Sequence, residues 1–145
     1  MSHKFLTINL TSDLHNLPVA EQEIMTFLKR EIKLSEEQLL DYKLIINELI
    51  INAIIHGNKK DPQKHVKVKV GVHYSKLSYI IVEDEGNGFE IESVYKDYTP
   101  IEYEDRIENI FENGRGLMIV NSLCETVKQN RKGNKIVALK ALSHV

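Results

Sequence analysis

Two polar residues, Glu48 and Asn52, lie inside an otherwise apolar stretch, 39–57, which reads LLDYKLIINELIINAIIHG. Residues four apart on an α-helix project from nearly the same face, because each residue turns the helix by about 100°. A buried carboxylate or carboxamide without a hydrogen-bond partner costs about 1–3 kcal/mol. The pair is therefore either bonded to neighbouring loops as a structural feature or part of a functional site, and this stretch alone leaves both interpretations open.

The helix that must carry this pair has a clear start signal. Ser35 and Gln38 have the spacing of a capping box, which predicts a helix from just after Ser35 to Gly57. Its isoleucine content would suit a buried strand, but about 20 residues are far too many for one. Because apolar residues occupy nearly every side, we expect this helix to be central and buried.

Two glycine-rich segments follow later in the chain, Asp84 to Gly88 (DEGNG) and Gly114 to Gly116 (GRG). The first ends a predicted strand, where glycines most often serve a turn. The second precedes a predicted helix, where exposed backbone N–H groups can also bind a phosphate. Each segment is weak evidence alone. Their order after the Glu48 helix, with a long segment between them, is far more specific.

The remaining elements predict an α+β fold. We expect a two-layer sandwich in which helices cover one face of a mixed, mostly antiparallel sheet. The predicted strands cover 4–10, 66–72, 77–84, 127–130 and 136–142, and the predicted helices cover 18–33, 36–57 and 117–126.

Residues 89–113 have no sustained periodicity and are too many for an ordinary loop in a compact domain. This segment has eight acidic residues and two basic ones, a local charge of −6. We expect it to be a mobile lid whose acidic side faces solvent.

Composition narrows the class of protein. A chain of 145 residues is expected to form one domain, 1–145. Its net charge of −2 argues against direct binding to nucleic acid or an anionic membrane, and no apolar run is long enough to span a bilayer. The single cysteine, Cys124, excludes an intramolecular disulfide and suits a reducing compartment. We therefore expect a cytoplasmic protein.

In this order, the three polar segments resemble the ATP-binding boxes of the Bergerat-fold ATPases, the superfamily of the gyrase, heat-shock chaperone, mismatch-repair and histidine-kinase ATP domains. Glu48 to His56 (ELIINAIIH) resembles the N box, Asp84 to Phe89 the first glycine box, and Gly114 to Leu117 (GRGL) the second. The resemblance covers essentially the whole chain. The greatest likeness is to the small stand-alone branch, the anti-sigma factors that are serine-protein kinases.

This resemblance implies ATP and Mg²⁺ as cofactors. Asn52 would coordinate Mg²⁺, and Glu48 would be the general base that orients or deprotonates the attacking hydroxyl. Asp84 would accept a hydrogen bond from the adenine amino group. The other residues implied to bind the nucleotide are Gly86, Gly88, Gly114, Arg115, Gly116 and Leu117.

The resemblance also implies an activity and partners. The chain would phosphorylate a serine or threonine on an anti-sigma-factor antagonist and sequester a sigma factor, and a homodimer is compatible with it. One departure is Gly133-Asn134, where the family often has glycine and threonine. It leaves open an alternative, a nucleotide-gated protein-binding module with little or no kinase activity. A third interpretation, in which all three clusters are structural, predicts no effect of Mg-ATP on the melting temperature.

Overall fold

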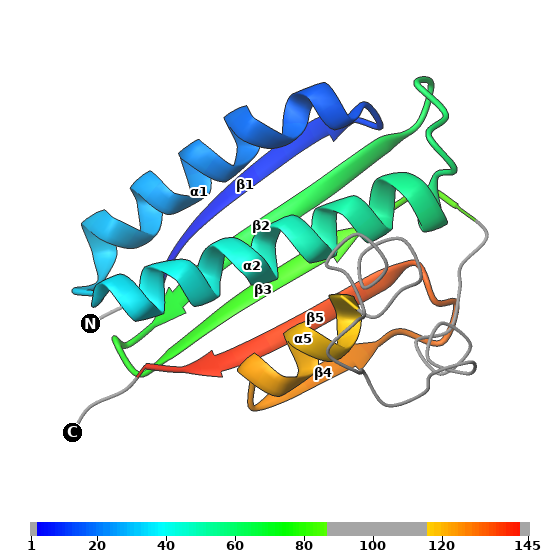
Figure 1. The fold of residues 1–145 in the computed structure, drawn as a ribbon. Helices are drawn as coiled ribbons and strands as arrows, with labels where there is room; N and C mark the ends of the chain where they lie inside the picture. Colours follow the sequence, from blue (N-terminus) through cyan, green and yellow to red (C-terminus); the bar gives the residue numbers. More distant parts are fainter. Residues whose placement is uncertain (1–2, 87–115, 143–145) are drawn as a thin grey trace, which may run out of the picture.

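The computed structural model of the chain describes residues 3–86 and 116–142, in which helices cover one face of a five-stranded sheet (Figure 1). The strand order is β1-β2-β3-β5-β4, and every pairing between these strands is antiparallel. The predicted two-layer α+β architecture is confirmed, whereas the sheet expected to be mixed is antiparallel throughout the described part. The strands are β1 (His3–Thr11), β2 (His65–His73), β3 (Leu77–Glu83), β4 (Thr126–Gln129) and β5 (Lys135–Ala141).

The helices are α1 (Leu17–Glu31), α2 (Glu36–Asn52) and α5 (Gly116–Leu123), with a short 3₁₀ turn, Leu14–Asn16, before α1. Helix α2 lies over the middle of the sheet between α1 and α5 (Figure 1). Its interior residues are almost fully buried, which confirms that this helix is central. The fully buried apolar side chains of α2 are Ile45, Ile46, Leu49 and Ile50.

The two ends of α2 differ. At the start, the predicted capping box is present: the Gln38 N–H donates to Ser35 Oγ (3.1 Å), and the Ser35 N–H donates to Gln38 Oε1 (2.9 Å). At the other end the α-helix stops at Asn52, and Ala53–Gly57 forms a π-turn. Such π-turns within helices are frequent at functional sites. The predicted helix end at Gly57 is therefore the end of this wider turn.

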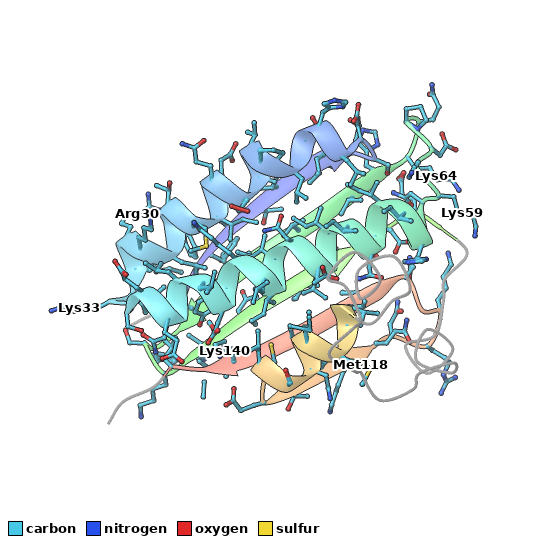
Figure 2. All side chains as sticks on the ribbon, in the orientation of Figure 1. Arg30, Lys33, Lys59, Lys64, Met118 and Lys140 are labelled. Carbon is cyan, nitrogen blue, oxygen red and sulfur yellow. The ribbon has the colours of Figure 1, made fainter. Side chains whose placement is uncertain are left out.

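Alternation along the strands separates a buried face from an open one. Val66, Val68, Val70 and Val72 of β2 point to the helices and are buried. In β3, Ile80 and Val82 are buried, whereas Tyr79 and Ile81 are only half-buried. Figure 2 shows side chains filling the layer between helices and sheet, with Lys59 and Lys64 at the end of the molecule where α2 finishes.

Helix α5 and the last two strands close the fold beside α2. Leu117 and Val120 of α5 are buried in the core, and the helix ends at Leu123 rather than at the predicted residue 126. Cys124 is partly buried against the core. In residues 3–86 and 116–142, no helix combines the length and apolarity that a membrane span requires. The predicted lid, 89–113, lies outside the described residues.

Candidate functional site

Glu48 and Asn52 lie on the buried side of α2, each with 1% of its surface exposed. Neither carboxylate oxygen of Glu48 has a hydrogen-bond partner among the described residues, and the same holds for Asn52 Oδ1. Buried polar atoms in folded proteins are nearly always bonded, so three unbonded oxygens on one helix face call for an explanation.

The amide of Asn52 is oriented by its own helix. Its Nδ2 donates to the backbone carbonyl of Glu48 (2.8 Å), which leaves Oδ1 as the atom available to a ligand. Burial raises the pKa of the Glu48 carboxyl to about 7, because an apolar environment disfavours the charged form. A carboxyl with this pKa can accept and release a proton near neutral pH, as a general base must.

Asp84 stands at the end of β3, packed against the π-turn that ends α2. It is 5% exposed, and its Oδ1 accepts from the Gly86 N–H (2.8 Å). A Cβ atom added to Gly57 would lie 2.2 Å from Asp84 Oδ2, and one added to Gly86 would lie 1.9 Å from the Gly57 carbonyl oxygen. Both glycines are thus needed for the close approach of these two backbone segments. Burial raises the pKa of the Asp84 carboxyl, an effect that the Gly86 N–H partly offsets.

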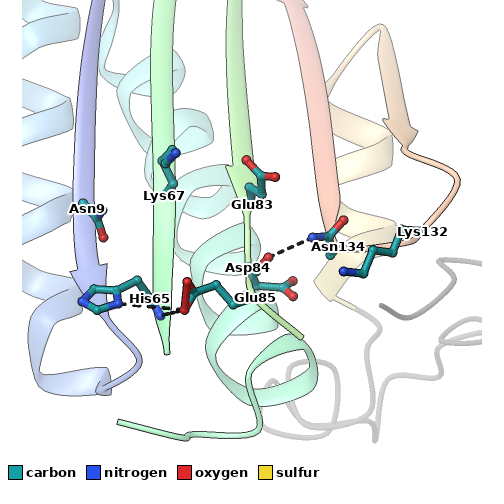
Figure 3. Close-up of a pocket in the computed structure, with 8 residues that line it drawn as sticks. All are labelled: Asn9, His65, Lys67, Glu83, Asp84, Glu85, Lys132 and Asn134. Atoms are coloured by element: carbon teal, nitrogen blue, oxygen red, sulfur yellow. Dashed lines mark hydrogen bonds and ion pairs between the residues drawn. The ribbon is translucent and has the colours of Figure 1, made fainter. Parts of the chain in front are cut away.

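Two asparagines that the sequence analysis did not assign to the site bind the backbone around Asp84. Asn134 Nδ2 donates to the Asp84 carbonyl (3.0 Å), and the Asp84 N–H donates to the Asn134 carbonyl (2.9 Å; Figure 3). Asn134, at the Gly133-Asn134 position where the chain departs from the family pattern, therefore binds the Asp84 backbone with its side chain. Asn58, directly after the π-turn, binds the next N–H, that of Glu85 (2.8 Å). An asparagine after a helix-ending glycine looks like any turn residue, so no sequence signal marked Asn58, and Gly57 was predicted only as the end of the helix.

A pocket of about 470 Å³ opens on the other side of this strand end. Asn9, Lys67 and Glu83 line it from the sheet face that the helices leave open (Figure 3). Asp84 also lines it, but Glu48 and Asn52 do not. This pocket is therefore not the site that the α2 residues define.

The remaining predicted site residues follow Asp84 along the chain. Gly116 is the first residue of α5, and Leu117 is a core residue with 1% exposure that packs the start of this helix. Gly88, Gly114 and Arg115 lie outside the described residues. The structure therefore brings Glu48 and Asn52 to one face of α2, and Asp84 and Gly86 to the π-turn at the end of that helix.

A two-layer α+β sandwich with buried polar oxygens on a central helix and a strand-end aspartate is the arrangement expected of an ATP-binding sandwich domain. Residues 10–140 match the family described as the histidine kinase-like ATPase domain, and the chain belongs to that family. Membership of an ATPase family implies ATP as the nucleotide.

The similar proteins carry two names, serine-protein kinase RsbW and anti-sigma F factor. The chain is 29% identical over 108 residues to serine-protein kinase RsbW of Bacillus subtilis (strain 168), covering 74% of this chain and 67% of that protein. It is 30% identical over 110 residues to anti-sigma F factor of Clostridium perfringens (strain SM101 / Type A), covering 74% and 75%. It is 32% identical over 94 residues to serine-protein kinase RsbW of Bacillus licheniformis, covering 65% of this chain and 58% of that protein. The match thus spans about three fifths to three quarters of these relatives. The resemblance seen in the sequence is confirmed.

The residues present fit a magnesium nucleotide. The unbonded oxygens on α2 are hard donors of the kind that Mg²⁺ prefers, and a metal bound largely through phosphates needs few protein ligands. Oδ1 of Asp84 is bonded to the Gly86 N–H. The two glycines leave no side chain between the π-turn and this carboxylate.

Proposed function

We propose that this chain binds Mg²⁺-ATP at the end of α2 and transfers the γ-phosphoryl group to a serine or threonine on a partner protein. The observation that carries the proposal is the buried Glu48 and Asn52 pair, whose three oxygens have no partner among the described residues. The relatives named serine-protein kinase support this reaction.

Each residue has one role in this proposal. Asn52 Oδ1 holds the metal ion, which when bound offsets the negative charge of the phosphates. Glu48 accepts the proton of the attacking hydroxyl as the hydroxyl oxygen bonds to the γ-phosphorus and ADP leaves. Asp84 Oδ2 accepts from the adenine amino group. The backbone N–H groups of Gly114 and Gly116 bind phosphates at the start of α5, Arg115 adds positive charge, and Gly86, Gly88 and Leu117 shape the site.

The named relatives support the choice of partners. We propose that the chain sequesters a sigma factor and phosphorylates an antagonist of that activity, in keeping with the name anti-sigma F factor. The single domain over 1–145, the lid over 89–113, a homodimer and a cytoplasmic location stay predictions.

The test is phosphoryl transfer from γ-labelled ATP to candidate antagonist proteins encoded by neighbouring genes. Glu48→Gln should lower the rate by about 10²–10⁴-fold, because general-base catalysis contributes about that factor. ATP binding should change little. Tyr42→Phe, a substitution on the same helix, is the matched control and should keep the wild-type rate. Equal transfer by the wild type and Glu48→Gln would remove Glu48 as the base. Tight ATP binding with no transfer to any candidate would favour the nucleotide-gated binding module instead.

A further inference from the structure

Asn58 is a completely buried asparagine whose side chain bonds three separate segments of the chain. Its Nδ2 donates to Ser12 Oγ (2.6 Å), just after β1, and to the His65 carbonyl (2.9 Å), at the start of β2. Its Oδ1 accepts from the Glu85 N–H (2.8 Å), just after β3. Both amide hydrogens and the amide oxygen are therefore in use, and three neighbouring strand ends meet at one side chain.

The backbone of Asn58 also fixes the end of the α2 helix. Its N–H donates to the Ala53 carbonyl (2.8 Å), which closes the π-turn, and its carbonyl accepts from the Asp61 N–H (3.0 Å). Because Asn52 immediately precedes this turn, Asn58 connects the helix end that carries Asn52 to the segment after β3.

One peptide group receives hydrogen bonds from two asparagines. The peptide between Asp84 and Glu85 has its carbonyl bonded by Asn134 Nδ2 (3.0 Å) and its N–H bonded by Asn58 Oδ1 (2.8 Å). A peptide held at both its donor and its acceptor cannot rotate without breaking a bond. This plane sets the ψ torsion of Asp84 and leads directly to Gly86, whose N–H donates to Asp84 Oδ1 (2.8 Å). The two asparagines therefore hold the backbone that orients the Asp84 carboxylate.

Only an asparagine meets these demands at position 58. Aspartate would keep the acceptor for Glu85 but would turn an oxygen toward the His65 carbonyl, while serine is too short and has a single donor. Either change leaves buried backbone groups unbonded, at about 1–3 kcal/mol each.

From this geometry we propose that Asn58 is a positioning residue for base recognition, which holds the Asp84–Glu85 peptide so that Asp84 Oδ2 selects a purine with an exocyclic 6-amino group. The proposal rests on the proposed function, because it assigns the nucleotide base to Asp84. Asn58 is itself buried behind this peptide, bonded to three protein segments, so it acts through Asp84 and has no role toward the phosphates.

The test compares two nucleotides that differ only at the contact in question. ATP and purine riboside triphosphate share the ring, the ribose and the phosphates, but the second lacks the 6-amino group. In calorimetry with Mg²⁺, the wild-type protein should bind ATP about tenfold or more tightly than purine riboside triphosphate, because one good hydrogen bond contributes about that factor. In Asn58→Ser this preference should fall below about threefold, chiefly through weaker ATP binding. Asn47→Ser is the control with the same change of residue type: the Asn47 side chain bonds Glu21 and the Lys43 carbonyl but does not contact the Asp84–Glu85 peptide, so it should keep the wild-type ratio.

The ratio separates positioning from general structural damage. A purely structural role would lower both affinities by the same factor and leave the preference intact. If Asn58→Ser does not fold, Ser12→Ala removes one acceptor of the Asn58 amide and should shift the ratio in the same direction by a smaller factor. A folded variant, Asn58→Ser or otherwise Ser12→Ala, with the wild-type ratio would overturn the proposal. Wild-type protein that binds neither nucleotide would overturn the proposed function itself, whereas a wild type that binds both equally would overturn only the base contact.

Discussion

Helix α2 carries two polar clusters that are equally buried but differ in whether their polar atoms have hydrogen-bond partners. Near its start, the Tyr42 hydroxyl donates to Ser78 Oγ (2.5 Å), and Ser78 Oγ donates to the Lys140 carbonyl (2.9 Å). Near its end, both carboxylate oxygens of Glu48 and Oδ1 of Asn52 lack partners among the described residues. Tyr42, Ser78, Glu48 and Asn52 are each 1% exposed. Burial therefore does not distinguish the clusters; the completeness of their hydrogen bonding does.

This difference separates a structural network from a candidate ligand site. The cluster around Tyr42 ends on a backbone carbonyl of β5 and ties the helix to the sheet. The cluster around Glu48 has acceptors without donors, a state that costs stability unless a ligand supplies positive charge. Three predictions test this contrast.

The largest expected effect concerns the pH dependence of stability. Burial raises the pKa of Glu48 from 4.5 to about 7 in the folded protein. Between these values the folded state keeps a proton that the unfolded state has lost, so the free energy of unfolding falls as pH rises. The contribution of protonated Glu48 to the free energy of unfolding is fully present below pH 4.5. About 3 kcal/mol is lost once pH exceeds about 7, at about 1.4 kcal/mol per pH unit.

Denaturant unfolding of the metal-free protein from pH 4.5 to 8.5 measures this effect. Glu48→Gln cannot titrate and should be the more stable protein at pH 8, with a flatter profile. Tyr42→Phe should keep the wild-type slope, because burial raises the pKa of Tyr42 to about 12, outside the tested range. Parallel profiles for the wild type and Glu48→Gln would contradict the raised pKa.

The second prediction concerns the metal. Asn52→Leu removes Oδ1 and should weaken ATP binding in the presence of Mg²⁺ by about 10–100-fold, or about 1.4–2.7 kcal/mol. Chelating the metal should weaken wild-type binding in the same way and have little further effect on the variant. Isothermal titration with and without EDTA measures both. An equal loss in Asn52→Leu with and without metal would show that Asn52 acts on the nucleotide by another route.

The sequence predicted the elements more completely than it predicted the contacts between them. The Ser35–Gln38 capping box and the strict alternation in β2 are local signals, so the start of α2 and the face that each β2 residue takes followed from spacing alone. The i,i+4 spacing likewise put Glu48 and Asn52 on one side of α2. The antiparallel order of the strands depends on pairings between distant residues, which periodicity does not encode.

Gly57 and Asn58 show where local reasoning ended. Their roles arise from contact with Asp84 and with the peptide that follows it, 27 residues away from Asn58 in the sequence. Glycine and asparagine are also common at helix ends where they serve only as turn residues. Only the folded structure shows that the added methyl of an alanine at position 57 would overlap the Asp84 carboxylate.

The smallest expected effect lies in the closed cluster, where the two partners should differ. Tyr42→Phe leaves the bond from Ser78 Oγ to the Lys140 carbonyl intact and keeps a ring beneath the Lys140 ammonium group (5.9 Å), so it should cost about 1 kcal/mol. Ser78→Ala leaves the buried Tyr42 hydroxyl without its partner, and should cost nearer 2 kcal/mol. Neither change should alter ATP affinity more than about twofold, because the network ends within the protein. Denaturant unfolding and calorimetry measure the two effects, and a large loss of ATP affinity in either variant would mean that the two clusters of α2 are coupled.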